Sequence, residues 1–210
     1  RPDKKEALSP DPSLLDAARA FSSDALLNMF GSRVARVGLL RFVQEDAGGI
    51  VEGMGAAWSS GAMDIEHEHF VSEVLRDFLA SKWRSLKVSL EGPCVVCGTL
   101  PGEQHGLGLQ FVACCLAASG YRVLFLGTNL PAASIAATVR DHGAVAVAIS
   151  ISGFSDEATN KSTLRELRRS LPEGTELWTG GRGSDNLQFG DVSFTDLRAF
   201  SSFIAGRYPV

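Results

Sequence analysis

The fold is decided by residues 94–118, which read CVVCGTLPGEQHGLGLQFVACCLAA. The segment opens with an apolar run over residues 94–100, passes through a short polar loop, and continues with apolar residues at helical spacing. A buried strand followed closely by such a helix is typical of a parallel β-α-β unit. We therefore expect a parallel sheet here, with the loop at the edge where open sheets of this kind bind ligands.

The same alternation of strand and helix continues to the end of the chain. Expected strands cover residues 94–100, 121–126, 145–151, 176–179 and 191–194, and expected helices cover residues 108–118, 132–141, 156–170 and 197–207. Parallel strands joined by helices imply right-handed crossovers. The pattern predicts a flavodoxin-like (Rossmann-type) five-stranded parallel sheet.

The part of the chain before Gly92 and Pro93 shows only helical patterns. Four helices are expected, near residues 14–18, 24–29 and 37–60, and from Asp64 to Trp83, with the second ending near Gly31. Helices with short connections favour a small bundle. The chain is thus expected to be α + α/β, with a four-helix bundle over residues 1–91 and an α/β domain over residues 92–210.

Composition excludes several classes of partner. The chain carries 20 Lys and Arg against 24 Asp and Glu, a net charge of −4, and has no basic stripe, which argues against direct nucleic-acid binding by this segment. No apolar run is long enough for a membrane span, and the polar start lacks a signal-peptide core, so a cytoplasmic protein is expected. The chain opens at Arg1 rather than Met, which suggests part of a longer protein.

The four cysteines are expected to be structural. Cys94 and Cys97 lie within a strand pattern, where they would point to opposite faces, and Cys114 and Cys115 lie within the next helix. A zinc or redox pair would need a loop or a helix start. We therefore expect four buried thiols in a reducing compartment.

The polar loop carries the candidate chemistry. His105 follows a predicted strand, and Glu103 stands two residues before it. A carboxylate at that spacing can hold one ring nitrogen and leave the other for a metal. A single histidine in a loop is more often a surface residue, so this pair needs support from elsewhere in the chain.

That support comes from two further elements at the ends of predicted strands. Three elements resemble the cobalamin-binding domain in this order: carboxylate-x-His-x-x-Gly at Glu103, His105 and Gly108, then Ser150, then Gly180-Gly181. The resemblance implies that the corrin lies over the strand ends and that the dimethylbenzimidazole tail leaves cobalt for a slot in the sheet. It also implies that His105 is the lower axial ligand of cobalt. This chain has Glu where the family usually has Asp, so its arm is longer.

Other residues receive roles from the same resemblance. Gly106, Leu107 and Gly108 are expected beside the macrocycle, where glycines keep side chains away from it. Ser150 and Ser152 could offer hydroxyl groups to the buried nucleotide tail. Gly180 and Gly181 would let the backbone approach that tail closely.

The helical part resembles a narrower group. Trp58 is followed after nine residues by Glu68-His69, a spacing similar to that of cobalamin-dependent, MerR-type light-sensing regulators, the CarH family. The resemblance implies a bundle that caps the upper corrin face, with Trp58 over the 5′-deoxyadenosyl group and Glu68 and His69 around it. Ser59 stands where regulators that form a bis-histidine adduct have His, so that photoproduct is not expected in the same form.

The expected function is an adenosylcobalamin-binding light-sensor module, not an enzyme. Photolysis of the Co–C bond would change its conformation or oligomeric state and control transcription or an attached effector outside this chain. A homo-oligomer is expected, and the related cobalamin-bilin photoreceptors raise a bilin as a second chromophore. The alternative is a corrinoid carrier protein of a methyltransferase system, because such carriers also join a helical bundle to this domain.

Overall fold

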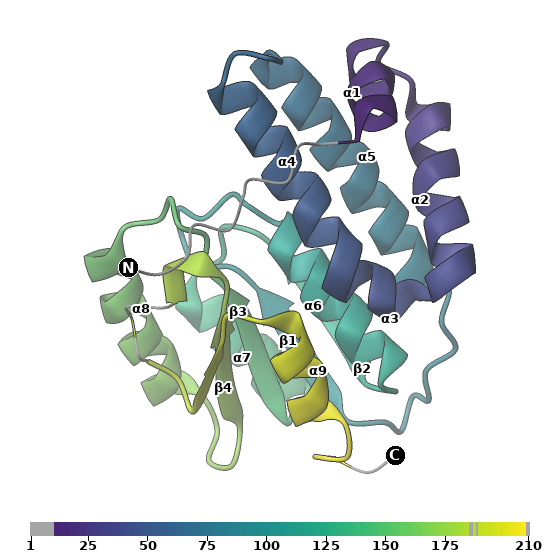
Figure 1. Ribbon diagram of the computed structural model, residues 1–210. Coiled ribbons are helices and arrows are strands. Elements are labelled where there is room, and N and C mark those ends of the chain that lie inside the picture. The colour runs from purple at the N-terminus through teal and green to yellow at the C-terminus, as the bar shows by residue number, and fades with distance from the viewer. Residues whose placement is uncertain (1–10, 185–186, 188, 209–210) are drawn as a thin grey trace. The chain divides into compact units, whose positions relative to one another are not determined.

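The computed structural model describes residues 11–184, 187 and 189–208. It divides into two compact units, a helical unit that ends at Lys82 and a sheet unit that begins at Trp83 (Figure 1). The division falls before the boundary expected after residue 91. Trp83 belongs to the sheet unit because its ring packs against Phe125, with centroids 5.9 Å apart, and donates a 2.8 Å hydrogen bond to Gln110.

The helical unit is built from long helices with short connections. Its elements are α1 (Pro12–Arg19), α2 (Ser23–Val37), α3 (Leu39–Arg41), the π-helical turn η1 (Phe42–Ala47), α4 (Gly48–Ser59) and α5 (Ile65–Arg84). α3, η1 and α4 follow one another without a break, so they form one long helix with a π-helical turn inside it. The expected arrangement of four helices is therefore present.

One expected helix boundary was wrong. The sequence suggested an end near Gly31, but α2 continues through that glycine to Val37. The chain turns instead at Gly38, whose φ of +84° is a conformation that side chains with a Cβ rarely adopt. Phe30, Phe42 and Phe78 then form the aromatic core of the bundle, with ring centroids 5.6 to 6.2 Å apart.

The sheet unit contains five parallel strands, which confirms the predicted flavodoxin-like fold. They are β1 (Cys94–Gly98), β2 (Arg122–Gly127), β3 (Ala146–Ser150), β4 (Glu176–Gly180) and β5 (Val192–Phe194). Their spatial order is β2-β1-β3-β4-β5. All five residues of β1 are buried, as expected for a central parallel strand covered on both faces.

Two helices cover each face of this sheet (Figure 1). They are α6 (Leu107–Ala118) and α9 (Leu197–Ile204) on one face, and α7 (Ala132–His142) and α8 (Glu157–Ser170) on the other. Ile135 and Val139 of α7 and Leu164 and Leu167 of α8 belong to the buried core beneath β1, β3 and β4. Because β1 pairs with β2 on one side and β3 on the other, the order of strands reverses there. The loops after β1 and β3 meet at this switch point, where open α/β sheets bind ligands.

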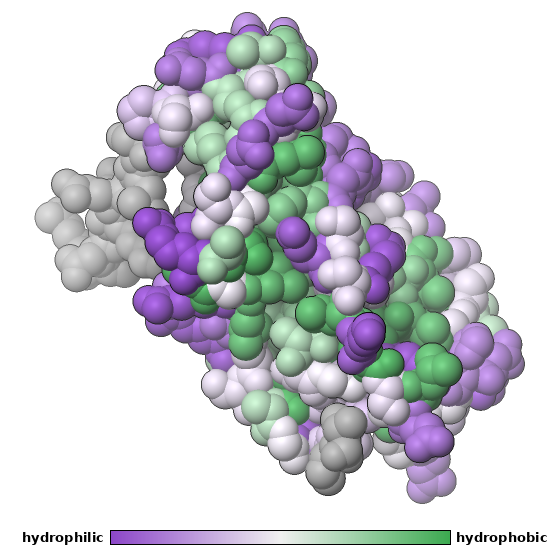
Figure 2. Space-filling view, turned by 90° about the vertical axis from the view of Figure 1, so that its right-hand side faces the viewer, coloured by the Kyte–Doolittle hydropathy of each residue, from purple (hydrophilic) through white to green (hydrophobic). Residues whose placement is uncertain are grey.

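The four cysteines are free and buried, as predicted. Within the described residues no helix is both long and apolar enough to cross a membrane. Some large apolar side chains reach the surface, and the face drawn in Figure 2 shows hydrophobic residues between hydrophilic ones. Single apolar residues at a surface are ordinary, so each needs a specific contact before it carries meaning. Phe154 has such a contact, because its ring stacks on His105.

Candidate functional site

The loop after β1 is held in place by a buried threonine. The Thr99 hydroxyl donates a 2.8 Å hydrogen bond to the carbonyl of Glu103 and accepts a 2.9 Å bond from the amide of Asn129. The Asn129 side chain accepts a further 2.8 Å bond from the amide of Gly102. Asn129 adopts a φ of +59°, which asparagine tolerates better than most residues. These contacts fix the backbone on which Glu103 and His105 stand.

Glu103 is only 2% exposed, and hydrogen-bond donors surround its carboxylate. Oε1 accepts from the backbone amide of His105 at 2.9 Å and lies 2.7 Å from its ring Nδ1. Oε2 accepts from the backbone amide of Ser152 at 2.8 Å. The longer glutamate arm therefore reaches the imidazole, and it joins the loop after β1 to the loop after β3.

These contacts determine which nitrogen of His105 can act as a ligand. Burial on its own would raise the pKa of Glu103, but the hydrogen bonds from Ser152 and His105 outweigh it and hold that pKa below its usual range. A carboxylate only accepts, so Nδ1 must carry the proton that lies between the two side chains. In the neutral ring Nε2 then keeps its lone pair. The His105 side chain is 58% exposed, so the ring that carries this nitrogen is accessible.

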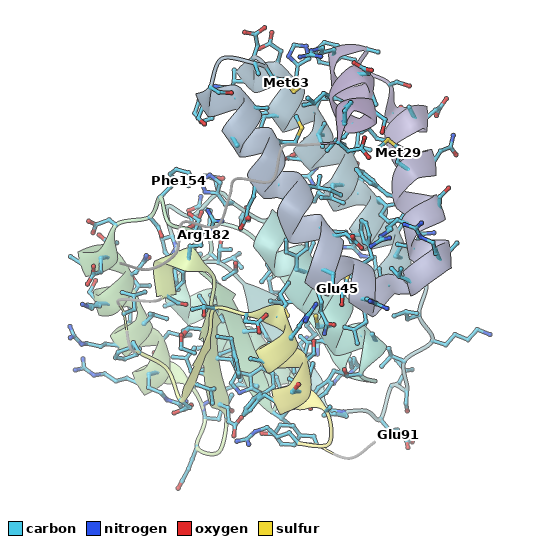
Figure 3. All side chains as sticks on the ribbon, in the orientation of Figure 1. Met29, Glu45, Met63, Glu91, Phe154 and Arg182 are labelled. Atoms are coloured by element: carbon cyan, nitrogen blue, oxygen red, sulfur yellow. The ribbon has the colours of Figure 1, made fainter. Side chains whose placement is uncertain are left out.

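The loop after β3 supplies two more contacts to the same histidine. The Ser152 hydroxyl lies 3.3 Å from Nδ1 of His105, and the Phe154 ring stacks on the imidazole with centroids 5.2 Å apart. Figure 3 shows Phe154 and Arg182 at the end of the sheet where β3 and β4 finish. Sequence reasoning missed Phe154, because nothing in its local pattern marks it as a neighbour of residue 105.

The glycines at and after the end of β4 are required by the packing of the chain itself. A Cβ on Gly180 would lie 2.9 Å from a carbonyl oxygen of β5, and one on Gly181 would lie 2.4 Å from the carbonyl oxygen of Ile151. A Cβ on Gly183 would lie only 2.1 Å from the carbonyl oxygen of Ser152. These glycines let the loop after β4 lie against the loop that bonds Glu103. Gly183 was missed, although the run Gly-Gly-Arg-Gly could have signalled it.

The start of α6 is also packed closely against its neighbours. A Cβ on Gly108 would lie 3.1 Å from the hydroxyl of Ser150, and one on Gly106 would lie 3.0 Å from a methyl group of Thr128. Leu107, the first residue of α6, is half-buried. Glycine at 106 and 108 thus lets the start of α6 lie close to the ends of β2 and β3.

The remaining predicted residues belong to the helical unit. Trp58 lies in the last turn of α4 and is 47% exposed, while Glu68 lies in the first turn of α5. Glu68 accepts a 2.8 Å hydrogen bond from the hydroxyl of Ser72 and lies 2.8 Å from Nδ1 of His69. A short turn joins the two helices, so Trp58 and Glu68 lie at the same end of the bundle.

His67 lies in the first turn of α5, beside Glu68. It is half-buried and stacks on Phe21 with ring centroids 4.9 Å apart. Its Nδ1 is buried with no hydrogen-bond partner among the described residues. The stacking explains why this ring turns inward.

The residues of the sheet unit fit a cobalt corrinoid. They present one accessible imidazole whose Nδ1 is held by a buried carboxylate, which is the usual arrangement behind a histidine that binds a transition metal. Gly106 and Gly108 carry no side chain at two of the three positions expected beside the macrocycle, and Leu107 between them is half-buried. His105 would hold the metal, with Glu103 and Ser152 behind it.

Comparison with known proteins finds similarity to a cobalamin-binding family and to two curated relatives. Residues 93–188 match the family model of the B12 binding domain. The chain is 27% identical over 176 residues to the HTH-type transcriptional repressor CarH of Myxococcus xanthus, covering 84% of this chain and 58% of that protein. It is 26% identical over 137 residues to a corrinoid protein of Desulfitobacterium hafniense, covering 62% of this chain and 63% of that one. The chain thus spans less than two thirds of the length of either curated relative.

A solved structure shares the fold. The monomethylamine corrinoid protein of Methanosarcina barkeri superposes with a TM-score of 0.69, covering 91% of this chain and 95% of that one. The identity is 14%, so the likeness concerns the fold alone.

Proposed function

We propose that this chain, whose residues 93–188 match the family model of the B12 binding domain, is the adenosylcobalamin-binding part of a light sensor. One observation carries the sensor assignment. The sheet unit begins only at Trp83, so an alignment of 176 residues with the CarH repressor has to extend into the helical unit. That unit carries Trp58, Glu68 and His69, the residues whose spacing resembles the light-sensing regulators.

Each unit has its own part in this proposal. In the sheet unit, Nε2 of His105 holds cobalt, while Glu103 keeps the proton on Nδ1 and orients the ring. Ser150, Ser152 and the pair Gly180-Gly181 border the nucleotide tail. When bound, adenosylcobalamin supplies a Co–C bond that light breaks.

In the helical unit, Trp58 offers a half-exposed ring that can cover the adenosyl group, and Glu68 and His69 help to enclose it. A helical unit that contacts the adenosyl group is stabilised in one arrangement only while that group is present. Loss of the group would therefore shift the population toward another arrangement. The output would be a change of oligomeric state or the action of an effector outside this chain, such as a DNA-binding domain. A bilin as a second chromophore is a further proposal, resting on the resemblance to cobalamin-bilin photoreceptors.

The alternative is a corrinoid carrier that presents a methyl group to partner enzymes. The similarity to the Desulfitobacterium hafniense corrinoid protein favours it. A carrier has to open the upper face of its cofactor to partners, whereas a sensor needs a closed cover over the adenosyl group. Trp58 is the residue on which the two alternatives differ most.

The test compares two forms of the cofactor. The chain is loaded in darkness with adenosylcobalamin or with methylcobalamin, and absorption spectra and size-exclusion profiles are recorded before and after green light. The sensor proposal predicts a preference for the adenosyl form that Trp58→Ala removes, together with a light-dependent change in both measurements. Equal affinity for the two forms and an unchanged elution profile after light would favour the carrier. His105→Ala serves as the control for cobalt ligation.

A further inference from the structure

Phe154 is the most unusual side chain near the site. It is 85% exposed, yet its ring stacks on the imidazole of His105 with an interplanar angle of 27°. An exposed phenylalanine does not by itself indicate a function. Phe154 differs because its ring stacks on the histidine that we propose as the cobalt ligand, and so restricts the orientation of that ring.

The loop that carries Phe154 is tied to the same serine that holds Glu103. The Phe154 amide donates a 3.3 Å hydrogen bond to the Ser152 hydroxyl, and the Ser155 hydroxyl donates a 2.9 Å bond to the Ser152 carbonyl. The side chain of Asn160, a buried residue of α8, donates a 3.0 Å bond to the Ser155 hydroxyl. The aromatic ring is therefore presented by an anchored turn.

Two contacts together fix the plane of the His105 ring. The bond from Nδ1 to Glu103 holds one edge of the imidazole, and the Phe154 ring covers one face. Rotation about the Cβ–Cγ bond would break the first contact and tilt the ring out of the second. The lone pair of Nε2 lies in the imidazole plane, so a ring stacked on the face leaves it free to bind.

We propose that Phe154 is a positioning residue that presets the direction of the His105 Nε2 lone pair toward cobalt. The inference rests on the proposed cobalt ligation by His105. Removing the aromatic ring should let the imidazole rotate, so that binding has to restrict it again. An aromatic pair contributes a free energy that corresponds to about a two- to tenfold change in affinity.

The experiment separates positioning from direct contact with the ligand. Affinity for hydroxocobalamin is measured by equilibrium dialysis for the full chain and for Phe154→Ala, Phe154→Leu and Phe154→Tyr, each with His105 intact and with His105→Ala. The inference predicts about two- to tenfold weaker binding for the alanine and leucine variants, and affinity restored by tyrosine. It also predicts no further loss from Phe154→Ala when His105 is absent, because the two residues act through one contact.

A second measurement needs no cofactor. In the apo-protein with isotope-labelled histidine, the ring protons of His105 should show a ring-current shift that vanishes in the alanine and leucine variants and persists with tyrosine. Phe21→Ala is the matched control, because it removes another exposed phenylalanine stacked on a histidine, His67. It should leave the His105 signals and the affinity unchanged.

The outcomes distinguish the two proposals. An equal loss from Phe154→Ala with and without His105, or no loss while binding still depends on His105, would overturn the positioning role alone. Equal binding by the wild-type chain and His105→Ala would overturn the proposed cobalt ligation, and the positioning role with it.

Discussion

Substitution of Glu103 by glutamine tests how the site is held together. The carboxylate accepts two hydrogen bonds at Oε1 and one at Oε2, and it is buried. Glutamine has only one oxygen, so whichever way its amide turns, at least one donor of His105 or Ser152 faces an NH₂ group. A buried donor without an acceptor costs about 1–3 kcal/mol, so Glu103→Gln should lower the free energy of unfolding of the sheet unit by that amount at neutral pH.

The loss should depend on pH with a definite sign. The pKa of Glu103 is lower in the folded chain, because hydrogen bonds from Ser152 and His105 outweigh the opposing effect of burial. The ionised carboxylate of Glu103 therefore stabilises the folded chain fully above the unfolded pKa of about 4.3. This stabilisation is lost as the pH falls through the lower folded pKa. The difference in free energy of unfolding between wild type and Glu103→Gln should become smaller over that acidic range, because a protonated carboxyl group resembles the amide.

Urea unfolding of the apo-protein followed by fluorescence provides the assay. The chain has three tryptophans, so a Trp58→Phe background leaves Trp83 and Trp178, both in the sheet unit. Glu157→Gln is the matched control, because Glu157 pairs with Lys161 on the surface of α8 and should matter by less than about 1 kcal/mol. The reasoning is refuted if Glu103→Gln is as stable as wild type at pH 7, or if its deficit stays constant down to acidic pH.

Three further predictions follow from individual contacts. His105→Ala should weaken cobalamin binding by about tenfold or more, yet change the free energy of unfolding by only about 1 kcal/mol, because the ring is largely exposed; dialysis and urea titration check both, and a large folding defect would contradict it. Gly183→Ala should destabilise the sheet unit by about 1–3 kcal/mol, because its Cβ would meet the Ser152 carbonyl; unchanged urea unfolding would contradict it. Burial raises the pKa of Cys115 to about 11 and raises the pKa of Cys97 further. Maleimide should therefore label the thiols of the native chain far more slowly than those of the unfolded chain. Rapid labelling of the native chain at pH 8 would contradict the burial of these thiols.

The elements predictable from the sequence are those with local signals. The apolar run at 94–100 and the helical spacing after it are sufficient to identify β1 and α6, because burial on both faces leaves a continuous hydrophobic pattern. Glu103 and His105 could be paired because they are two residues apart. Their contact is observed at 2.7 Å.

Contacts between distant segments could not be predicted in the same way. That the Ser152 hydroxyl faces the nucleotide tail stays a prediction. The bond from its amide N–H to Glu103 has no sequence signal, because every residue but proline has an amide N–H. The pairing of Thr99 with Asn129 depends on β1 and β2 being neighbours. The end of α2 at Gly38 rather than Gly31 depends on packing, because a glycine inside a helix costs only about 1 kcal/mol and tertiary contacts can override it.

The central claim is that a nitrogen of His105 binds the cobalt of a cobalamin held at the end of the sheet. The most direct test is the electron paramagnetic resonance spectrum of the chain loaded with cobalamin and reduced to cobalt(II), prepared with ordinary histidine and with nitrogen-15 histidine. The account predicts that the hyperfine splitting from the axial nitrogen changes from a triplet to a doublet with the label, and that His105→Ala loses this change. A hyperfine splitting that is the same with and without the label would show that the cofactor's own base, and not His105, occupies the axial position.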